Sequence, residues 1–245
     1  MFVNMKTKSN FLYNLTMKHQ RGGKYVKDMV YGANDGIVTT FAVVAGVMGG
    51  GLPAIAIVLI GVASLFADAF SMAASNFLGS KSETEFYERE RRIEEWEIEN
   101  KREHELEETG EFLRQKGYEE DDRKKLTELI SKNKEFWLDI MMREELDLAR
   151  SRSMSSKVSA FATFVSFVAA GFVPLIPFLI WEGDKGALFT LAIFFTALAL
   201  FFVGAVRTHF TGKNWVKAGF EMLLIGGIAS VIAYTAGAVV KWLIG

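Results

Sequence analysis

The 245-residue chain contains no cysteine, and it has only three prolines and three histidines. Without cysteine it forms no disulfide and no thiolate metal site, and it has no cysteine nucleophile. Any metal ion must therefore be held by carboxylate, methionine, amide, hydroxyl, carbonyl or histidine groups. The first 27 residues carry scattered lysine and arginine but no apolar core segment, so no signal peptide is expected.

Hydrophobic residues make up half of the chain, and charged residues are distributed unevenly along it. Residues 80–157 contain 23 acidic and 17 basic residues, whereas the rest of the chain contains 6 acidic and 11 basic residues. The net charge of −1 therefore combines an acidic insert with a hydrophobic, mildly basic remainder. Since the basic residues form no concentrated patch, we expect no nucleic-acid partner.

Five apolar segments are long enough to cross a bilayer, which takes about 20 residues as a helix. The predicted spans cover residues 28–50, 53–79, 158–180, 187–206 and 218–242. Glycines before Pro53 predict a tight turn after the first span, and Pro174 and Pro177 should kink the third. The predicted fold class is all-α: a five-helix transmembrane bundle with a cytoplasmic helical insert after the second span.

The predicted domains are a leader at 1–27, spans one and two at 28–79, the insert at 80–157, and spans three to five at 158–243. The leader is expected to hold a short surface helix near residues 11–16. In the insert, a helix over 81–109 should continue the second span, with breaks at Gly110 and Gly117. Asp121 or Asp122 should cap a helix that ends near Ser131, and a last helix is predicted over 134–150.

Basic residues indicate how the chain is oriented. The leader, the insert and the loop at 207–217 all carry lysine or arginine, whereas the loops at 49–52 and 181–186 have only Lys185. Because basic loops stay in the cytoplasm, we expect the N-terminus and residues 80–157 to be cytoplasmic. The sequence does not decide between a cell membrane and a vacuole-type membrane.

Two carboxylates lie in the interior of predicted spans, away from the span ends. Asp35 is flanked by Gly32 and Gly36, which allow close approach of a neighbouring helix, and Asp68 lies four residues before Met72. A carboxylate at this depth costs at least about 2.5–3.5 kcal/mol on insertion scales, and such groups usually handle ions or protons. The alternative is a structural aspartate that is bonded to a neighbouring hydroxyl.

Several short motifs occur here in an order that resembles the vacuolar iron transporter family. They are Asp35-Gly36 with Val38–Ala42, Ser71-Met72, Lys81–Glu83, Met141–Leu146 and Gly171–Pro177. The resemblance covers about residues 25–243, including the five spans and the position of the insert. It implies a homodimer that exports ferrous iron from the cytosol in exchange for protons, without a permanent cofactor.

The resemblance also implies site residues. Asp35 and Met72 match residues that line the family's metal path between protomers. A family glutamate falls at Ser64 here, so we expect Asp68, one turn further on, to take its role. In the insert, the positions that match the family's metal ligands are Glu94, Glu97, Glu105, Glu108, Met141 and Glu145, with Met142 adjacent.

Spacing alone supports this ligand set only in part. On one continuous helix the four glutamates from Glu94 to Glu108 would fall within about 80° of arc, but Lys101 lies in the middle of that stripe. The residues alone favour a solvated acidic helix, and they predict that Met141 is a core residue. The roles of His104 and Glu221 stay open.

Other hypotheses also fit a membrane-bound metal protein. A membrane ferroxidase would show Glu-x-x-His pairs, but Lys101 lies three residues before His104. A membrane-anchored metal-binding or metal-sensing protein has no reason to bury Asp35 and Asp68. The cargo could be manganese instead of iron.

The homodimer needs a contact surface. Gly32, Gly36 and Gly46 predict such a close-approach face on the first span.

Overall fold

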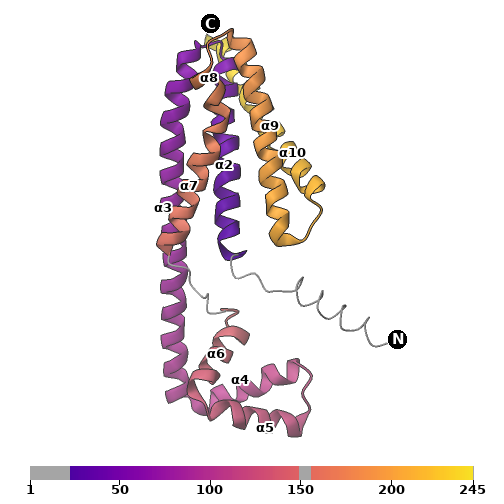
Figure 1. The fold of residues 1–245 in the computed structure, drawn as a ribbon. Helices are drawn as coiled ribbons and strands as arrows, with labels where there is room; N and C mark the ends of the chain where they lie inside the picture. Colours follow the sequence, from indigo (N-terminus) through magenta and orange to yellow (C-terminus); the bar gives the residue numbers. More distant parts are fainter. Residues whose placement is uncertain (1–22, 149–155, 245) are drawn as a thin grey trace, which may run out of the picture. The chain divides into compact units, whose positions relative to one another are not determined.

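The computed structural model describes residues 23–148 and 156–244, and within these ranges it is helical and has no strand (Figure 1). The helices are α2 (Gly23–Gly49), α3 (Ala54–Asn100), α4 (Arg102–Gln115), α5 (Glu120–Ser131), α6 (Lys134–Glu144), α7 (Ser156–Gly171), η1 (Val173–Leu175), α8 (Ile176–Ile180), α9 (Lys185–Thr211) and α10 (Trp215–Ile244). The helix expected near residues 11–16 lies outside the described residues.

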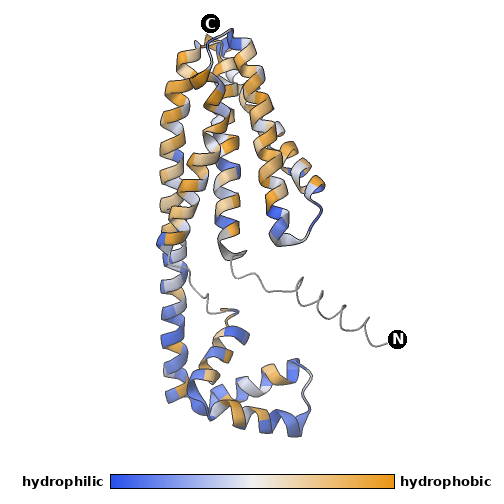
Figure 2. Ribbon diagram, viewed as in Figure 1, coloured by the Kyte–Doolittle hydropathy of each residue, from blue (hydrophilic) through white to orange (hydrophobic). Residues whose placement is uncertain are grey.

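The chain divides into two compact units, each with its own hydrophobic core. One unit, called the bundle here, comprises Met1–Ala74 and Ser159–Gly245. The other, called the insert, is Ser75–Val158. The boundary falls inside α3, which is one uninterrupted helix of 47 residues. Such a helix is about 70 Å long, roughly twice the thickness of a bilayer core. Its residues change from hydrophobic to hydrophilic along its length (Figure 2).

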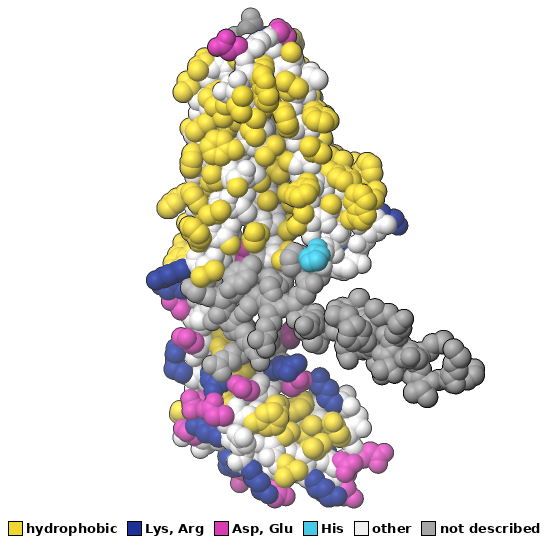
Figure 3. Space-filling view, viewed as in Figure 1, with side chains coloured by type: hydrophobic (Ala, Val, Ile, Leu, Met, Phe, Trp, Pro, Cys, Tyr) yellow, Lys and Arg dark blue, Asp and Glu magenta, His cyan; other side chains and the backbone are white. Residues whose placement is uncertain are grey.

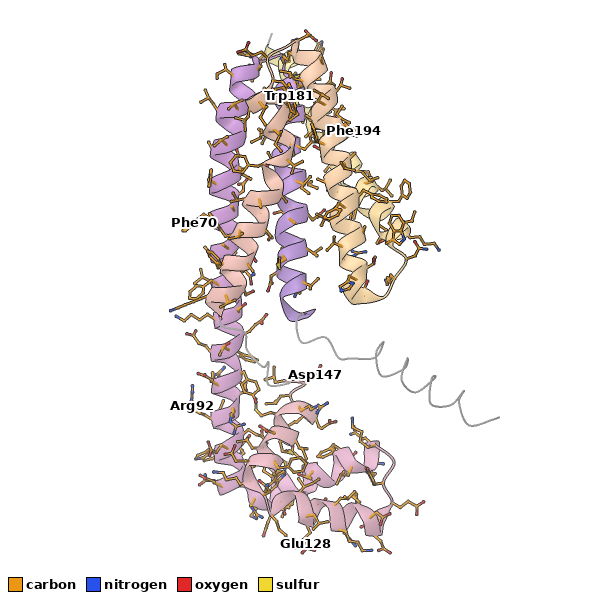
Figure 4. The ribbon with its side chains drawn as sticks, viewed as in Figure 1. Phe70, Arg92, Glu128, Asp147, Trp181 and Phe194 are labelled. Carbon is orange, nitrogen blue, oxygen red and sulfur yellow. The ribbon has the colours of Figure 1, made fainter. Side chains whose placement is uncertain are left out.

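Within the described ranges, five helical segments are long and apolar enough to cross a membrane, as the sequence predicted. They are Val26–Gly49, Ala54–Asn100, Ser156–Ile180, Lys185–His209 and Trp215–Ile244. Their surface is dominated by hydrophobic side chains in the face shown in Figure 3. Phe70 and Phe194 are 70% and 61% exposed and point away from the helices that carry them (Figure 4). An apolar exterior of this kind is suited to lipid.

Turns and kinks of the bundle follow the glycines and prolines. α2 ends at Gly49, and Gly51 has a φ of +73°, which glycine adopts without strain. The third span breaks into α7, η1 and α8 around Pro174 and Pro177, so the predicted kink is confirmed.

Glycines of α2 make close contacts inside the chain. A Cβ added to Gly36 would overlap the backbone of Phe167 on α7, and one added to Gly237 on α10 would overlap the carbonyl of Gly46. Gly32 faces Thr163 and Ser166 in the same way. The expectation that these glycines form the contact with a second copy is therefore wrong, because α7 and α10 already occupy that face.

The insert differs from the predicted helices at its first turn. α3 ends at Asn100, and Lys101 leaves helical geometry with φ −125° and ψ 36° before α4 begins. The continuous helix predicted over 81–109 is therefore wrong. Ending α3 here allows Ile98 on α3 and Leu113 on α4 to share one core with Trp137 on α6, and this burial favours the break.

Three further boundaries also differ. Gly110 does not break α4; its position is close to Thr127 of α5, where a small residue suits helix packing. Gly117 does end the segment, with a φ of +93°. Glu119 precedes α5, so Asp121 and Asp122 lie in its first turn, where negative charge favours the helix dipole. α6 stops at Glu144 instead of residue 150, and residues 149–150 lie outside the described ranges.

Candidate metal site

Three carboxylates of the insert converge from different parts of its fold. Glu94 lies on α3, Glu105 on α4, and Glu145 directly follows α6. Carboxylate oxygens of the three lie within 4.8 Å of one another. The break at Lys101 places Glu94 and Glu105 on separate helices, and the Glu145 N–H donates to the Met141 carbonyl at 3.0 Å. The cluster therefore depends on the tertiary fold and not on one helical stripe.

Two of these carboxylates are buried. Glu94 is 2% exposed and Glu105 is 1% exposed. The Oε1 atom of Glu94 and the Oε2 atom of Glu105 have no hydrogen-bond partner among the described residues. Buried polar atoms nearly always have a partner, so two such oxygens in one carboxylate cluster indicate a place for a proton or a cation. A solvated acidic helix, which the residues alone favoured, is therefore wrong for Glu94 and Glu105.

The pKa values of the cluster are raised. Burial, followed by repulsion from Glu145 and Glu105, raises the pKa of Glu94 to about 8. Burial is also the main reason that the pKa values of Glu105 and Glu145 lie above their usual range. A divalent cation among these groups would reverse both effects, because it is attracted to every carboxylate that repels its neighbour. The cluster can hold protons or a metal ion.

Glu97 and Glu108 form an outer part of the same acidic region. Both raise the pKa of Glu105 by repulsion, so both lie within electrostatic reach of the cluster. Their carboxylates have partners of their own, however: Lys101 Nζ contacts Glu97 at 2.7 Å, and His104 Nε2 contacts Glu108 at 3.3 Å. Lys101, placed within the glutamate stripe by the sequence, thus neutralises one of its members.

The two methionines of the predicted site lie in the insert core, where Met141 and Met142 are 1% and 0% exposed. The Met141 sulfur lies 3.4 Å from the Thr109 hydroxyl, and this hydroxyl lies 2.7 Å from the Glu105 carbonyl oxygen. Met141 is therefore linked through Thr109 to the helical turn that carries Glu105. For Met142, the described contacts are those of a core residue.

Thr109 was not predicted from the sequence. It is fully buried, and its hydroxyl also accepts a hydrogen bond of 2.7 Å from Trp137 Nε1. One hydroxyl thus connects α4 to the indole and the thioether of α6. The available signal was its position four residues after Glu105, which places both on one helix face.

The two carboxylates predicted to line the transport path lie on adjacent spans. Asp35 on α2 is partly buried, Asp68 on α3 is exposed, and the two carboxylates are close enough to repel each other. The nearby Thr39 hydroxyl donates to the Asp35 backbone carbonyl at 2.7 Å, and no described residue donates a hydrogen bond to the Asp35 carboxylate. The alternative of an aspartate tied to a neighbouring hydroxyl is therefore not what the described residues show. Met72, one turn after Asp68, packs against the bundle core.

The chain was compared with known proteins. Residues 26–238 match the model of the VIT family. Vacuolar iron transporter 1 of Arabidopsis thaliana is 34% identical over 234 residues, which cover 96% of this chain and 93% of that protein. Vacuolar iron transporter 1 of Tulipa gesneriana is 34% identical, covering 95% of this chain and 94% of the relative. The vacuolar iron transporter of Plasmodium falciparum is 30% identical, with coverages of 96% and 90%. Matches of this extent confirm the resemblance seen in the sequence motifs, and the chain belongs to the VIT family.

Proposed function

We propose that this chain is an integral membrane transporter that exports ferrous iron from the cytosol in exchange for protons, with manganese as a second possible cargo. The observation that supports this proposal most directly is the pair of carboxylates, Asp35 and Asp68, on adjacent membrane-spanning helices. The names of the relatives, vacuolar iron transporter, support iron as cargo. In this proposal iron is the substrate, and no permanent cofactor is needed.

The proposed path uses Asp35, Asp68 and Met72. Carboxylates are hard ligands that accept many divalent ions, whereas a thioether favours transition metals over magnesium and calcium. Asp68 and Met72 lie one turn apart on α3, so they can present one ligand of each kind to the same ion. The same carboxylates can carry protons in the reverse direction, since proton and metal compete for one set of oxygens.

We propose a homodimer in which α3 of each copy contributes to the contact. In the bundle, Asp68 and Ser71 are exposed on α3, and polar groups facing lipid are unfavourable. In the insert, α3 exposes Ser82, Phe86, Arg89, Ile93 and Trp96, at alternating spacings of four and three residues. That spacing is typical of helix pairing, so a second copy would cover both stretches. This face replaces the glycines of α2 as the predicted contact.

The insert is proposed to bind metal on the cytoplasmic side and to supply it to the path. Glu94, Glu105 and Glu145 would hold the ion, Met141 would add a soft ligand, and Glu97 and Glu108 would attract cations. Met142 packs in the core and is dropped from the ligand set. The orientation rests on the basic loops: the N-terminus and residues 80–157 face the cytoplasm, in a cell membrane or a vacuole-type membrane.

Two other functions explain less of the structure. A ferroxidase with a di-iron site would use histidine beside glutamate, but the carboxylate cluster found among the described residues contains none. A membrane-anchored metal-binding or sensing protein would explain the insert but leaves the neighbouring Asp35 and Asp68 without a purpose. Transport accounts for both units.

Flux into liposomes tests the proposal. Purified protein should move ferrous iron across the bilayer, faster when a pH gradient is imposed, and the same assay run ion by ion gives the cargo. Asp35→Asn should abolish the flux, whereas the matched control Glu182→Gln, an exposed acid between α8 and α9, should not. Metal binding without flux would support the sensor, and oxygen-dependent formation of ferric iron without flux would support the ferroxidase.

A further inference from the structure

The bundle has an apolar groove that the transport proposal does not use. It lies between α9 and α10, with α2 at its floor, and has a volume of about 400 Å³. Its lining includes Phe41, Ile193, Leu200, Leu223, Gly227 and Val231. Ile193 and Val231 are 46% and 63% exposed, so the groove is open along the outer, lipid-facing side of the spans.

Gly227 keeps this groove open. A Cβ built on Gly227 would meet no atom within 4 Å, whereas one on the adjacent Gly226 would overlap Leu200. Gly226 thus packs closely against Leu200 of α9, whereas Gly227 does not. The space beside Gly227 is therefore free for a molecule from outside the chain.

One end of the groove leads to a basic turn. Lys213 lies in the turn between α9 and α10, and Lys217 lies in the first turn of α10, about 9 Å along the helix from Leu223. Glu221 is the only acidic residue between 186 and 244, and it is paired with Arg207 at 2.7 Å. Neither Lys213 nor Lys217 forms an ion pair with a described residue, and both are exposed.

An apolar groove with exposed lysines beyond one end matches the two halves of an anionic lipid. Basic residues between spans attract anionic head groups, and Trp215, 57% exposed beside Lys217, is a residue type typical of the membrane interface. We propose that this groove binds an anionic phospholipid, with one acyl chain beside Gly227 and the phosphate at Lys213 and Lys217. If the proposed orientation holds, this lipid belongs to the cytoplasmic leaflet, where anionic lipids are abundant.

Lipid titration of the full-length protein in detergent, followed by native mass spectrometry, tests the site. Phosphatidylglycerol should bind more tightly than phosphatidylcholine. Replacing both lysines, Lys213→Gln with Lys217→Gln, should weaken phosphatidylglycerol binding about thirtyfold, which corresponds to about 1 kcal/mol per lysine. The control pair Lys124→Gln with Lys125→Gln, on α5 of the insert, should change nothing.

A second variant tests the acyl-chain half. Gly227→Leu adds a side chain whose Cβ meets no atom within 4 Å, so it should occupy groove space and reduce binding of both lipids, whereas Gly183→Leu, at another open position, should not. Soluble glycerophosphate should bind far more weakly than the lipid, since it lacks the chain. Equal binding of the two lipids, or unchanged binding in Gly227→Leu, would overturn the proposal. A lower oligomeric mass in Gly227→Leu would also overturn it, because a second copy would then be the occupant. All readouts are independent of flux, so the transport proposal can fail without this one.

Discussion

Replacing Glu94 by Gln should make the metal-free insert more stable at neutral pH. Glu94 has its pKa raised from 4.5 to about 8, so it is largely neutral in the folded protein at pH 7 but ionised in the unfolded chain. The folded state therefore binds more protons than the unfolded state between these two pKa values. Stability consequently falls as the pH rises from about 4.5 to about 8. Gln cannot ionise, so the variant lacks this loss.

The expected magnitude follows from the size of the shift. Each pKa unit corresponds to about 1.4 kcal/mol, so Glu94→Gln should stabilise the metal-free protein by about 3 kcal/mol at pH 7 and by almost nothing at pH 4.5. The value at pH 7 is an upper limit, because Glu94 interacts with Glu105 and the two carboxylates share the unfavourable free energy of ionisation. The amide of Gln can still donate a hydrogen bond to Glu105, so the packing should be retained.

Urea unfolding in detergent with a chelator, at several pH values, measures this effect. The emission of Trp137, in a full-length variant in which it is the only tryptophan, reports on the insert because this residue is fully buried in the insert core. The control Glu97→Gln should shift stability by less than about 0.5 kcal/mol, because that carboxylate is partly exposed and its ion pair with Lys101 is worth little. If Glu94→Gln is no more stable than the parent protein at pH 8, burial and repulsion do not raise the pKa of Glu94 as described.

Three further predictions concern the path, the insert and the dimer. Asp35→Asn should keep the fold but lose flux, because the amide retains the shape and removes the charge; wild-type flux would eliminate Asp35 as a carrier. Thr109→Val should lower stability by about 1–2 kcal/mol, since Trp137 Nε1 loses its partner, and should reduce the preference for manganous over magnesium ions in calorimetry. Thr109→Ser should restore both, and unchanged selectivity in Thr109→Val would limit the hydroxyl to a structural role. Cysteine in place of Ile93 should crosslink two copies, whereas cysteine at Gly46, packed against Gly237, should not; a monomeric mass without crosslinking at Ile93 would contradict the dimer.

The bundle could be predicted from the sequence because its signals are local. Twenty apolar residues in a row define a span, and two prolines interrupt the hydrogen bonding of the third span wherever the rest of the chain lies. Asp35 and Asp68 were identifiable for the same reason, since a carboxylate in an apolar run is unusual on any fold. Their proximity, however, is a tertiary property that the sequence did not reveal.

The insert was harder to predict because its break has no local signal. Neither glycine nor proline marks Lys101, and a helix continuing to Thr109 satisfies every local preference. The core around Trp137 favours the break, and only this core explains how Glu94 and Glu105 become buried. For the same reason the arc calculated for a continuous helix did not describe the site, although the ligand set implied by the family resemblance contained all three clustered carboxylates.

The proposed exchange of metal for protons would follow from placing carboxylates where water is scarce. Asp35 and Asp68 repel each other, and two negative charges in an apolar region are unfavourable unless a cation or a proton accompanies them. Departure of one positively charged species therefore favours arrival of another. The buried glutamates of the insert obey the same rule, since burial and repulsion raise the pKa of Glu94 to about 8. Metal binding to these glutamates should release protons near neutral pH, and a lower pH should weaken it. In the proposed orientation, the insert would load metal best when the cytosolic proton concentration is low.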